Sequence, residues 1–382
     1  MGSLSKVYIN RISKYLPNKP ISNEEMEGIL GQIGGVPSKA RRIVLRNNGI
    51  KNRYYALNAN GDTTHSNAQL AKNAIEGLFD ESFTKNEVEV LSCGTSTPDQ
   101  MLPSHAVMVH GELANRNMEL NSASGVCCAG MSSLKYGFMS VLSGNSENAI
   151  CSGSEKVSSW MVADKFNNEI ENAVALEEQP IIAFKKDFLR WMLSDGAGAV
   201  LLENKPNVDK VSLRIDWIES YSYAHEVETC MYAGGEKLAD GGIKPWSDYK
   251  ADTWLKESIF SLKQDVKILD ENILVKGVES IKMAFEKHKK DSSDIDYFLP
   301  HISSYYFEGK LKQLVKDEDG LYIPEDSWFT NLDRVGNVGS ASIYLMLEEL
   351  FNSGKLEKGQ KIVLSVPESG RFSYSYAHLT VC

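Results

Sequence analysis

Two adjacent cysteines, Cys127 and Cys128, stand where a run of small and polar residues gives way to a helical pattern. Apolar alternation precedes them, and apolar side chains then recur at Met131 and Leu134. This pattern predicts a strand, a tight turn and an amphipathic helix that begins near Cys128. A thiol in that place faces unpaired backbone N–H groups and the positive end of the helix dipole, which favour the thiolate. Cys128 is therefore the candidate nucleophile, and the same N–H groups can hold an oxyanion.

The alternative is that both cysteines are small buried side chains, because free cysteine is among the most buried residue types. The six cysteines lack the spacing of a disulfide framework, and neither a CxxC pair nor an HExxH motif occurs. We therefore expect reduced thiols, no metal site and no cofactor.

Composition narrows the class of protein. The chain has 382 residues, of which 42% are hydrophobic, and its net charge is -10. An acidic chain of this kind is not expected to bind nucleic acid or a membrane surface, because it has no excess positive charge to neutralise phosphates. No apolar run approaches the ~18 residues that span a bilayer, and the N-terminus lacks a signal segment. These features favour a cytoplasmic protein.

The elements that position the cysteines alternate between strands and helices. In the first part we expect strands near 7–12, 88–93, 149–155 and 197–202, with helices near 67–79 and 104–113. In the second part we expect a helix at 273–288, a strand at 297–300, a helix after residue 342, and strands at 361–366 and 372–381. This order predicts a layered α/β architecture with two similar halves, 1–205 and 206–382.

Short motifs along the chain add to this pattern. They are Cys128-Ala129-Gly130, Asp195-Gly196-Ala197-Gly198-Ala199, Leu299-Pro300-His301, Gly336-Asn337 and Ser340-Ala341-Ser342. Their order and approximate spacing resemble the type III β-ketoacyl-acyl-carrier-protein synthases over nearly the whole chain. The resemblance implies the thiolase fold, with αβαβα layers and a five-stranded sheet in each half, and a homodimer. From the residues alone, the glycine run at 195–199 indicates close backbone packing without a ligand.

The resemblance also assigns roles. It maps the family's catalytic Cys, His and Asn onto Cys128, His301 and Asn337. Cys128 would carry the acyl group, while His301 and Asn337 would stabilise the enolate of a second thioester. The backbone N–H groups of Cys128 and Gly370 would form the oxyanion hole. Without the resemblance, His301 could be a structural histidine, Asn337 a helix-capping asparagine and Gly370 a hairpin glycine.

Residues 7–18 and 47–55 resemble one branch of the family, the DarB and StlD ketosynthases of dialkylresorcinol and stilbene biosynthesis. This implies Michael addition of a 3-oxoacyl thioester to an α,β-unsaturated acyl group, followed by Claisen closure onto the Cys128 thioester and release of a cyclohexane-1,3-dione. His301-Ile302-Ser303-Ser304 departs from the family's His-Gln-Ala-Asn. Arg41 and Arg42 stand near the place of its adenine-stacking tryptophan, so acyl-carrier-protein thioesters are expected rather than coenzyme A thioesters.

Alternatives to this activity stay open. One is an ordinary synthase III that performs a single decarboxylative condensation with malonyl-acyl-carrier protein. Another is a non-catalytic partner subunit, although the presence of Cys128 counts against it. A degradative thiolase would need a second cysteine near Gly370, where the sequence has none. A papain-like hydrolase would carry its cysteine near the N-terminus.

Three further stretches carry expectations about partners and the pocket. The run Gln100-Met101-Leu102-Pro103 aligns with a loop that crosses the dimer interface in the family, which places Leu102 in the neighbour's substrate pocket. Four lysines on or after the helix at 273–288 predict a patch for an acidic carrier protein, although they also suit a solvated helix end: Lys282, Lys287, Lys289 and Lys290. The segment from Trp160 to Trp191 is expected to be a surface excursion, a lid or a pocket wall.

Overall fold

The computed structural model describes residues 4–38, 41–165, 189–256 and 258–382. Its main sheet has nine strands in the order β13-β14-β15-β8-β1-β7-β6-β4-β5. The first half of the chain contributes β1 (Tyr8–Tyr15), β4 (Val90–Thr95), β5 (Glu119–Ser124), β6 (Asn148–Glu155) and β7 (Gly196–Glu203). The second half contributes β8 (Leu213–Ser222), β13 (Tyr297–Pro300), β14 (Lys361–Glu368) and β15 (Ser373–Val381).

The two sets of strands meet at a short seam. Strand β1 pairs with β7 along its length but with β8 only at Tyr8 and Ile9. The expectation of five strands in each half is wrong for the second half, which supplies four to the described sheet. Between β8 and β13 the chain instead forms two small ribbons, β9 (Met231–Tyr232) with β12 (Lys263–Gln264) and β10 (Gly235–Lys237) with β11 (Ile243–Pro245). A third ribbon pairs β2 (Ile21–Ser22) with β3 (Asn52–Arg53).

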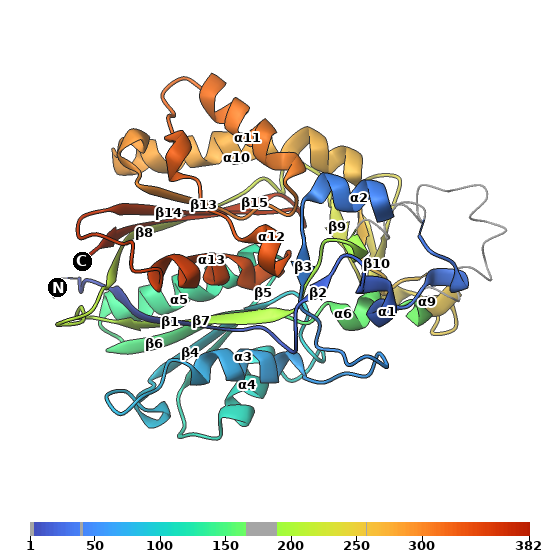
Figure 1. Ribbon diagram of the computed structural model, residues 1–382, viewed down its shortest axis with the longest axis horizontal. Coiled ribbons are helices and arrows are strands. Elements are labelled where there is room, and N and C mark those ends of the chain that lie inside the picture. Colours follow the sequence, from blue (N-terminus) through green and yellow to red (C-terminus); the bar gives the residue numbers. More distant parts are fainter. Residues whose placement is uncertain (1–3, 39–40, 166–188, 257) are drawn as a thin grey trace.

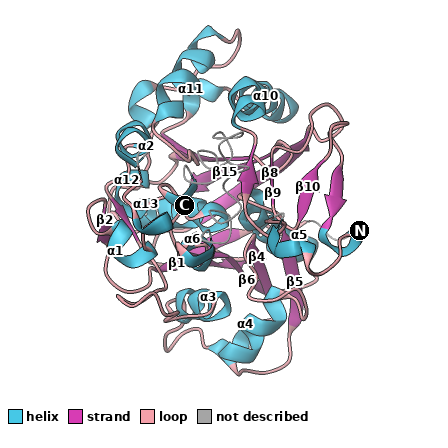
Figure 2. Cartoon of the chain, turned by 90° about the vertical axis from the view of Figure 1, so that its right-hand side faces the viewer, coloured by secondary structure: helices cyan, strands magenta, loops and turns pink. Residues whose placement is uncertain are grey.

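Helices form three layers around the strands (Figure 1). Helices α3 (Asn67–Glu76) and α4 (His105–Leu113) cover the outer face of the first set, and α10 (Val266–His288) and α11 (Tyr306–Asp317) cover the outer face of the second. Helices α5 (Cys128–Ser143) and α13 (Ser342–Phe351) lie between them. The side view in Figure 2 shows the same succession from α11 and α10 down to α3 and α4. The predicted αβαβα layering is confirmed.

The remaining helices are short and lie around the ends of these layers. They are α1 (Met26–Leu30), α2 (Arg41–Asn48), α6 (Ser158–Met161), α9 (Thr253–Lys256) and α12 (Leu332–Val335). None of the helices in the described ranges has the length and the apolar character of a membrane span.

The central layer is packed closely because small residues stand where backbones meet. A Cβ atom on Gly130 would lie 2.1 Å from the carbonyl oxygen of Ser340, so only glycine lets α5 approach the turn before α13. In the same way, a Cβ on Gly198 of β7 would lie 2.4 Å from the Cβ of Tyr344 in α13. The glycine run at 195–199 therefore serves close packing, as predicted.

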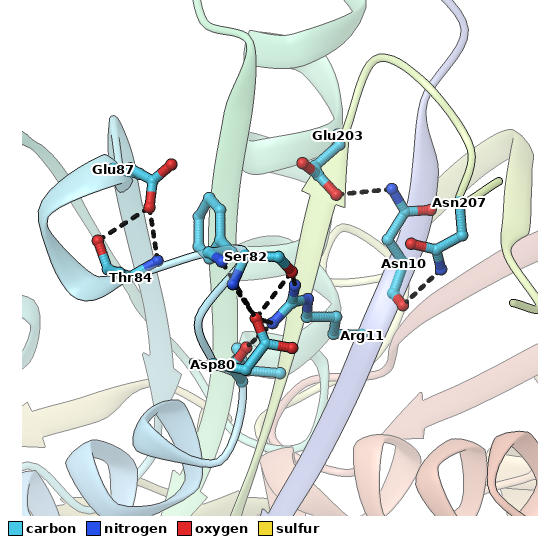
Figure 3. Close-up of polar contacts among 10 residues, drawn as sticks. Asn10, Arg11, Asp80, Ser82, Thr84, Glu87, Glu203 and Asn207 are labelled. Carbon is cyan, nitrogen blue, oxygen red and sulfur yellow. Dashed lines mark hydrogen bonds and ion pairs between the residues drawn. The ribbon is translucent and has the colours of Figure 1, made fainter. Parts of the chain in front are cut away.

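Polar contacts fix β1 in place at the centre of the sheet (Figure 3). Arg11 donates to Ser82 at 2.6 Å and forms an ion pair with Asp80 at 2.9 Å, both in the loop after α3. Asn10, which precedes Arg11 in the strand, donates a hydrogen bond from its side chain to Glu203 of β7 at 2.6 Å. The Arg11 contacts thus hold β1 to the loop after α3, and the Asn10 contact holds it to β7, next to the seam that joins the two sets of strands.

Candidate functional site

A cavity of about 310 Å³ opens beside the turn that precedes α5. Its polar end carries Cys127, His301 and Asn337. Its wall is mostly apolar, and one part of it comes from α10, α11 and the strands they cover: Leu269, Ile273, Leu274, Gly277, Val278, Ile281, Phe298, Phe307, Leu311, Val315, Tyr374 and Tyr376. A cavity with this lining can hold an acyl chain, with its reactive end at the polar groups.

Cys128 is the first residue of α5, as the sequence predicts, and its side chain is buried. Its Sγ lies 3.3 Å from the carbonyl oxygen of Val366 and 3.7 Å from that of Ser373. Burial, and then the charge of Glu368, raise the pKa of the Cys128 thiol well above its ordinary value. The effect of the helix start on the thiolate, which the sequence predicts, is therefore opposed by the burial of the thiol. The neighbouring Cys127 lines the cavity.

Glu368 is the residue that sequence reasoning missed. It is the last residue of β14, and its Oε2 accepts hydrogen bonds from the backbone N–H groups of Val126 and Cys128, each at 3.0 Å. The N–H group assigned to the oxyanion hole is thus already occupied by a carboxylate. The only available signal was an acidic residue between a buried strand and a glycine turn.

Gly370, the other predicted oxyanion residue, lies in the turn just beyond Glu368. A Cβ on Gly370 would lie 3.2 Å from Cγ2 of Val126 and 3.4 Å from Oε1 of Glu368, so this glycine borders the turn before Cys128. Its carbonyl oxygen accepts from the backbone N–H of Cys230 at 2.9 Å. The structure brings Gly370 close to the nucleophile turn, and its role as an oxyanion donor stays a prediction.

His301 follows β13 and lies in the cavity with its side chain buried. Its backbone N–H donates to the carbonyl oxygen of Ser365 at 2.8 Å, which ties it to β14. Burial lowers the pKa of His301 to about 4. The ring is therefore neutral at pH 7 and has one N–H donor and one acceptor nitrogen.

Asn337 lies between α12 and α13. Its Oδ1 accepts from the backbone N–H of Gly339 at 2.9 Å, and its backbone N–H donates to the carbonyl oxygen of Met192 at 3.0 Å. The side-chain oxygen thus holds the turn before α13, which is similar to the helix-capping role that the sequence also allows for Asn337. The Nδ2 group makes no hydrogen bond within the described ranges, and the residue lines the cavity beside His301. His301 and Asn337 therefore line the same cavity and can each donate a hydrogen bond, which suits them to stabilise enolate charge.

Glu155 is a second carboxylate at the cavity that the sequence did not single out. Its oxygens accept from the backbone N–H groups of Ser96 and Ser340 and from the hydroxyls of Ser96 and Thr97. Burial raises the pKa of Glu155, and these hydrogen bonds oppose the shift. This network ties the end of β6 to the turn before α13. Within the described part of the chain, no group of three or more potential ligands could hold a metal ion.

The other predicted site residues lie away from this cavity. Leu102 is 85% exposed and does not line it. Lys282 forms an ion pair with Glu318 at 2.6 Å, and Lys287 forms one with Glu219 at 2.8 Å, so half of the predicted patch is already paired. The exposed Lys289 and Lys290 follow the C-terminal end of α10, whose earlier turns line the cavity. Of the segment from Trp160 to Trp191, residues 166–188 lie outside the described ranges.

Solved structures with the same architecture define the fold class. The model superposes on AbyA1, a tetronic acid condensing enzyme, with a TM-score of 0.72 and 18% identity, covering 98% of this chain and 99% of that chain. It superposes on 3-oxoacyl-(acyl carrier protein) synthase III of Pseudomonas aeruginosa with a TM-score of 0.71 and 18% identity, covering 98% of each chain. For a variant of OleA from Xanthomonas campestris the values are 0.70 and 16%, covering 99% of this chain and 100% of that chain. The predicted thiolase-like fold is confirmed.

Sequence relatives extend the likeness over the whole chain. The β-ketoacyl-[acyl-carrier-protein] synthase III of a Sulfurovum species is 24% identical over 372 residues, covering 95% of this chain and 93% of the relative. That of Rickettsia typhi is 26% identical over 356 residues, covering 93% and 94%. Residues 285–371, which include His301 and Asn337, match the family described as 3-oxoacyl-[acyl-carrier-protein (ACP)] synthase III C terminal. The predicted resemblance to the synthase III family is confirmed, whereas the closeness to the DarB and StlD branch stays a prediction.

Proposed function

We propose that this protein is a condensing enzyme of the ketosynthase III type, which joins two acyl thioesters through an acyl group carried on Cys128. The observation that carries the proposal is the convergence of His301 and Asn337 on one cavity, beside the turn that holds the cysteine pair. The neutral His301 and the Nδ2 group of Asn337 are suited to donate to a thioester oxygen on which negative charge develops. The likeness of the chain to synthases III along its length supports the same assignment.

The finer proposal concerns the substrates. A 3-oxoacyl thioester would add through its C2 to the β-carbon of an α,β-unsaturated acyl group on Cys128. In a Claisen closure, C4 of the 3-oxoacyl group would then lose a proton and bond to the acyl carbon on Cys128. The carbon–sulfur bond would break, the leaving thiolate would take up a proton, and a cyclohexane-1,3-dione would form, the precursor of a dialkylresorcinol. The N-terminal resemblance to the DarB and StlD ketosynthases supports this choice. AbyA1, whose name describes a tetronic acid condensing enzyme, has the same fold.

The partners follow from the same proposal. Acyl-carrier-protein thioesters are the substrates we expect, because the relatives carry that carrier in their names. Coenzyme A thioesters are the alternative donors. The enzyme would act as a homodimer in which Leu102 reaches the neighbouring subunit.

Product analysis tests the proposal. A 3-oxoacyl and a 2-enoyl thioester would be supplied together, and the cyclic dione would be sought by mass spectrometry, with Cys128→Ala as the inactive control. We expect the dione only when both thioesters and the intact cysteine are present. A linear 3-oxo product that forms only with a malonyl thioester would instead identify an ordinary synthase III.

A further inference from the structure

The proposed reaction needs a base that an ordinary synthase III does not need. A malonyl donor generates its carbanion by losing carbon dioxide, whereas a 3-oxoacyl donor must lose a proton from C2. A side chain near the nucleophile therefore has to accept that proton. Among the described residues, His301, Glu155 and Cys127 line the cavity, while Glu368 and Cys128 lie at the turn beside it.

Glu368 has the geometry of a proton acceptor. Its Oε2 is held by the N–H groups of Val126 and Cys128, while its Oε1 makes no hydrogen bond within the described ranges. Two glycines lie against the carboxylate: a Cβ on Gly125 would be 3.4 Å from Oε2, and a Cβ on Gly370 would be 3.4 Å from Oε1. Glu368 itself does not line the cavity, but Gly125, which lies against its Oε2, and its chain neighbours Pro367 and Ser369 do. The carboxylate therefore lies directly behind this part of the wall.

The competing groups are less suited to this role. Both oxygens of Glu155 are engaged by donors from Ser96, Thr97 and Ser340, so neither is free to take up a proton, whereas Oε1 of Glu368 has no donor within the described ranges. His301 would have to carry a positive charge in a buried place, which its lowered pKa of about 4 shows to be unfavourable. Burial raises the pKa of Glu368, which makes its carboxylate a stronger base than an exposed one.

We propose that Glu368 is the general base for the 3-oxoacyl donor, an inference that rests on the proposed function. The C2–H bond breaks, its proton passes to Oε1 of Glu368, and the electron pair forms an enolate that His301 and Asn337 stabilise. The enolate carbon bonds to the β-carbon of the enoyl group on Cys128. The proton held by Glu368 then passes to the α-carbon of that group, which restores the carboxylate.

Proton transfer to Glu368 also changes the oxyanion site. A neutral carboxylic acid is a weaker acceptor than a carboxylate, so protonation loosens the hydrogen bond from the Cys128 N–H. That N–H then becomes available to the thioester oxygen. The Cys128 N–H therefore binds the Glu368 carboxylate in the resting enzyme and the thioester oxygen while Glu368 is protonated.

Hydrogen exchange tests the inference separately from product formation. A 3-oxoacyl thioester would be incubated in deuterated buffer, and exchange at C2 above the rate without enzyme would be followed by mass spectrometry. Glu368→Gln keeps an oxygen that can accept from the N–H groups but removes the base. We expect the ratio of its C2 exchange rate to its rate of acylation by an enoyl thioester to be lower than in the wild type by about 100-fold or more.

Two further variants make the outcome decisive. Glu155→Gln alters the buried carboxylate that lines the cavity and is expected to keep the wild-type ratio of exchange to acylation. Glu368→Asp keeps a carboxylate and is expected to retain part of the exchange even where the glutamine variant does not fold. Three outcomes would overturn the inference. They are an equal fall of exchange and acylation in Glu368→Gln, a loss of exchange in Glu155→Gln but not in Glu368→Gln, and no exchange by the wild type. Exchange by the wild type without any dione would refute the proposed function alone, and dione formation at an unchanged rate in Glu368→Gln would refute the inference alone.

Discussion

At Cys128 two opposing effects act on one thiol. The start of α5 favours the thiolate, but burial and the nearby Glu368 carboxylate favour the neutral thiol. A thioester that enters the cavity meets Cys127 on its wall, so the two cysteines have to be distinguished by experiment. We expect Cys128→Ala to abolish the acyl adduct and Cys127→Ala to keep it, as measured by intact-protein mass spectrometry. An adduct that maps to Cys127 would show that the motif alignment is displaced by one residue.

The lowered pKa of His301 makes the unfolding free energy of the protein depend on pH. Its folded pKa of about 4 lies below its ordinary value of 6.5, so the unfolded chain binds more protons between these values. Stability is therefore fully present above pH 6.5 and is lost as the pH falls toward 4. We expect His301 to cost the wild type about 2 kcal/mol of unfolding free energy between pH 7 and pH 5, and His301→Gln to lose less over that interval. Urea unfolding at the two pH values measures this, and an identical loss in both proteins would contradict it.

The motifs in the sequence single out Cys128, His301 and Asn337 as candidates, but they do not point to Glu368. The hydrogen bond from the Cys128 N–H to Glu368 joins residues 240 positions apart. Such a contact depends on how β14 lies against α5, and no local pattern encodes it. The burial of the Cys128 thiol, which raises its pKa, likewise depends on how distant segments pack and is not encoded in a local pattern.

Among the elements, α10 is the one that shapes the acyl cavity. Gly277 lies on its cavity face, and a Cβ there would come within 3.3 Å of Cε1 of Tyr374. We expect Gly277→Leu to fill part of the cavity and to reduce acylation by long-chain thioesters roughly tenfold more than by short-chain ones. Gly309→Leu in α11 is the matched control, because no atom lies within 4 Å of a Cβ at Gly309. Equal chain-length profiles for the two variants would show that this part of the cavity does not hold the acyl chain.

The end of α10 carries the predicted carrier-protein patch. Lys289 and Lys290 are exposed there, whereas Lys282 and Lys287 are paired with acidic residues. We expect Lys289→Glu with Lys290→Glu to raise the KM for a carrier-bound substrate several-fold and to leave a small thioester mimic unaffected, since an acidic carrier would be repelled. Steady-state kinetics at low salt measures both. A common change for the two substrates would mean that these lysines only complete the helix end.

Periodicity in the sequence predicts most elements of the fold, and the exceptions have physical causes. The expected helix at 273–288 begins earlier, at Val266, because the Asp265 side chain accepts from the backbone N–H groups of Lys267 and Ile268 and caps the helix there. The missing fifth strand of the second half cannot be predicted from apolar alternation. Strand pairing is decided by partners far along the chain, and here the intervening segment pairs within itself.

At the scale of the whole molecule, the described surface has two features that a second copy of the chain could cover. Strand β5 is the last strand of the main sheet, so one of its edges is unpaired in the described structure. Met101 and Leu102, which precede α4, are 63% and 85% exposed. An open sheet edge and exposed apolar side chains are the usual material of an interface between two copies of one chain.

We therefore expect a homodimer in which these surfaces are covered by a second copy. Leu102→Asp should shift the sedimentation coefficient toward that of a monomer and lower the activity, because the pocket of each subunit would lose the side chain that its neighbour supplies. Val208→Asp is the matched control, since Val208 is 95% exposed in the link between β7 and β8, away from β5. A wild type that sediments as a monomer and is fully active would exclude both the dimer and the shared pocket. A dimer that survives Leu102→Asp with unchanged activity would keep the assembly but remove Leu102 from the site.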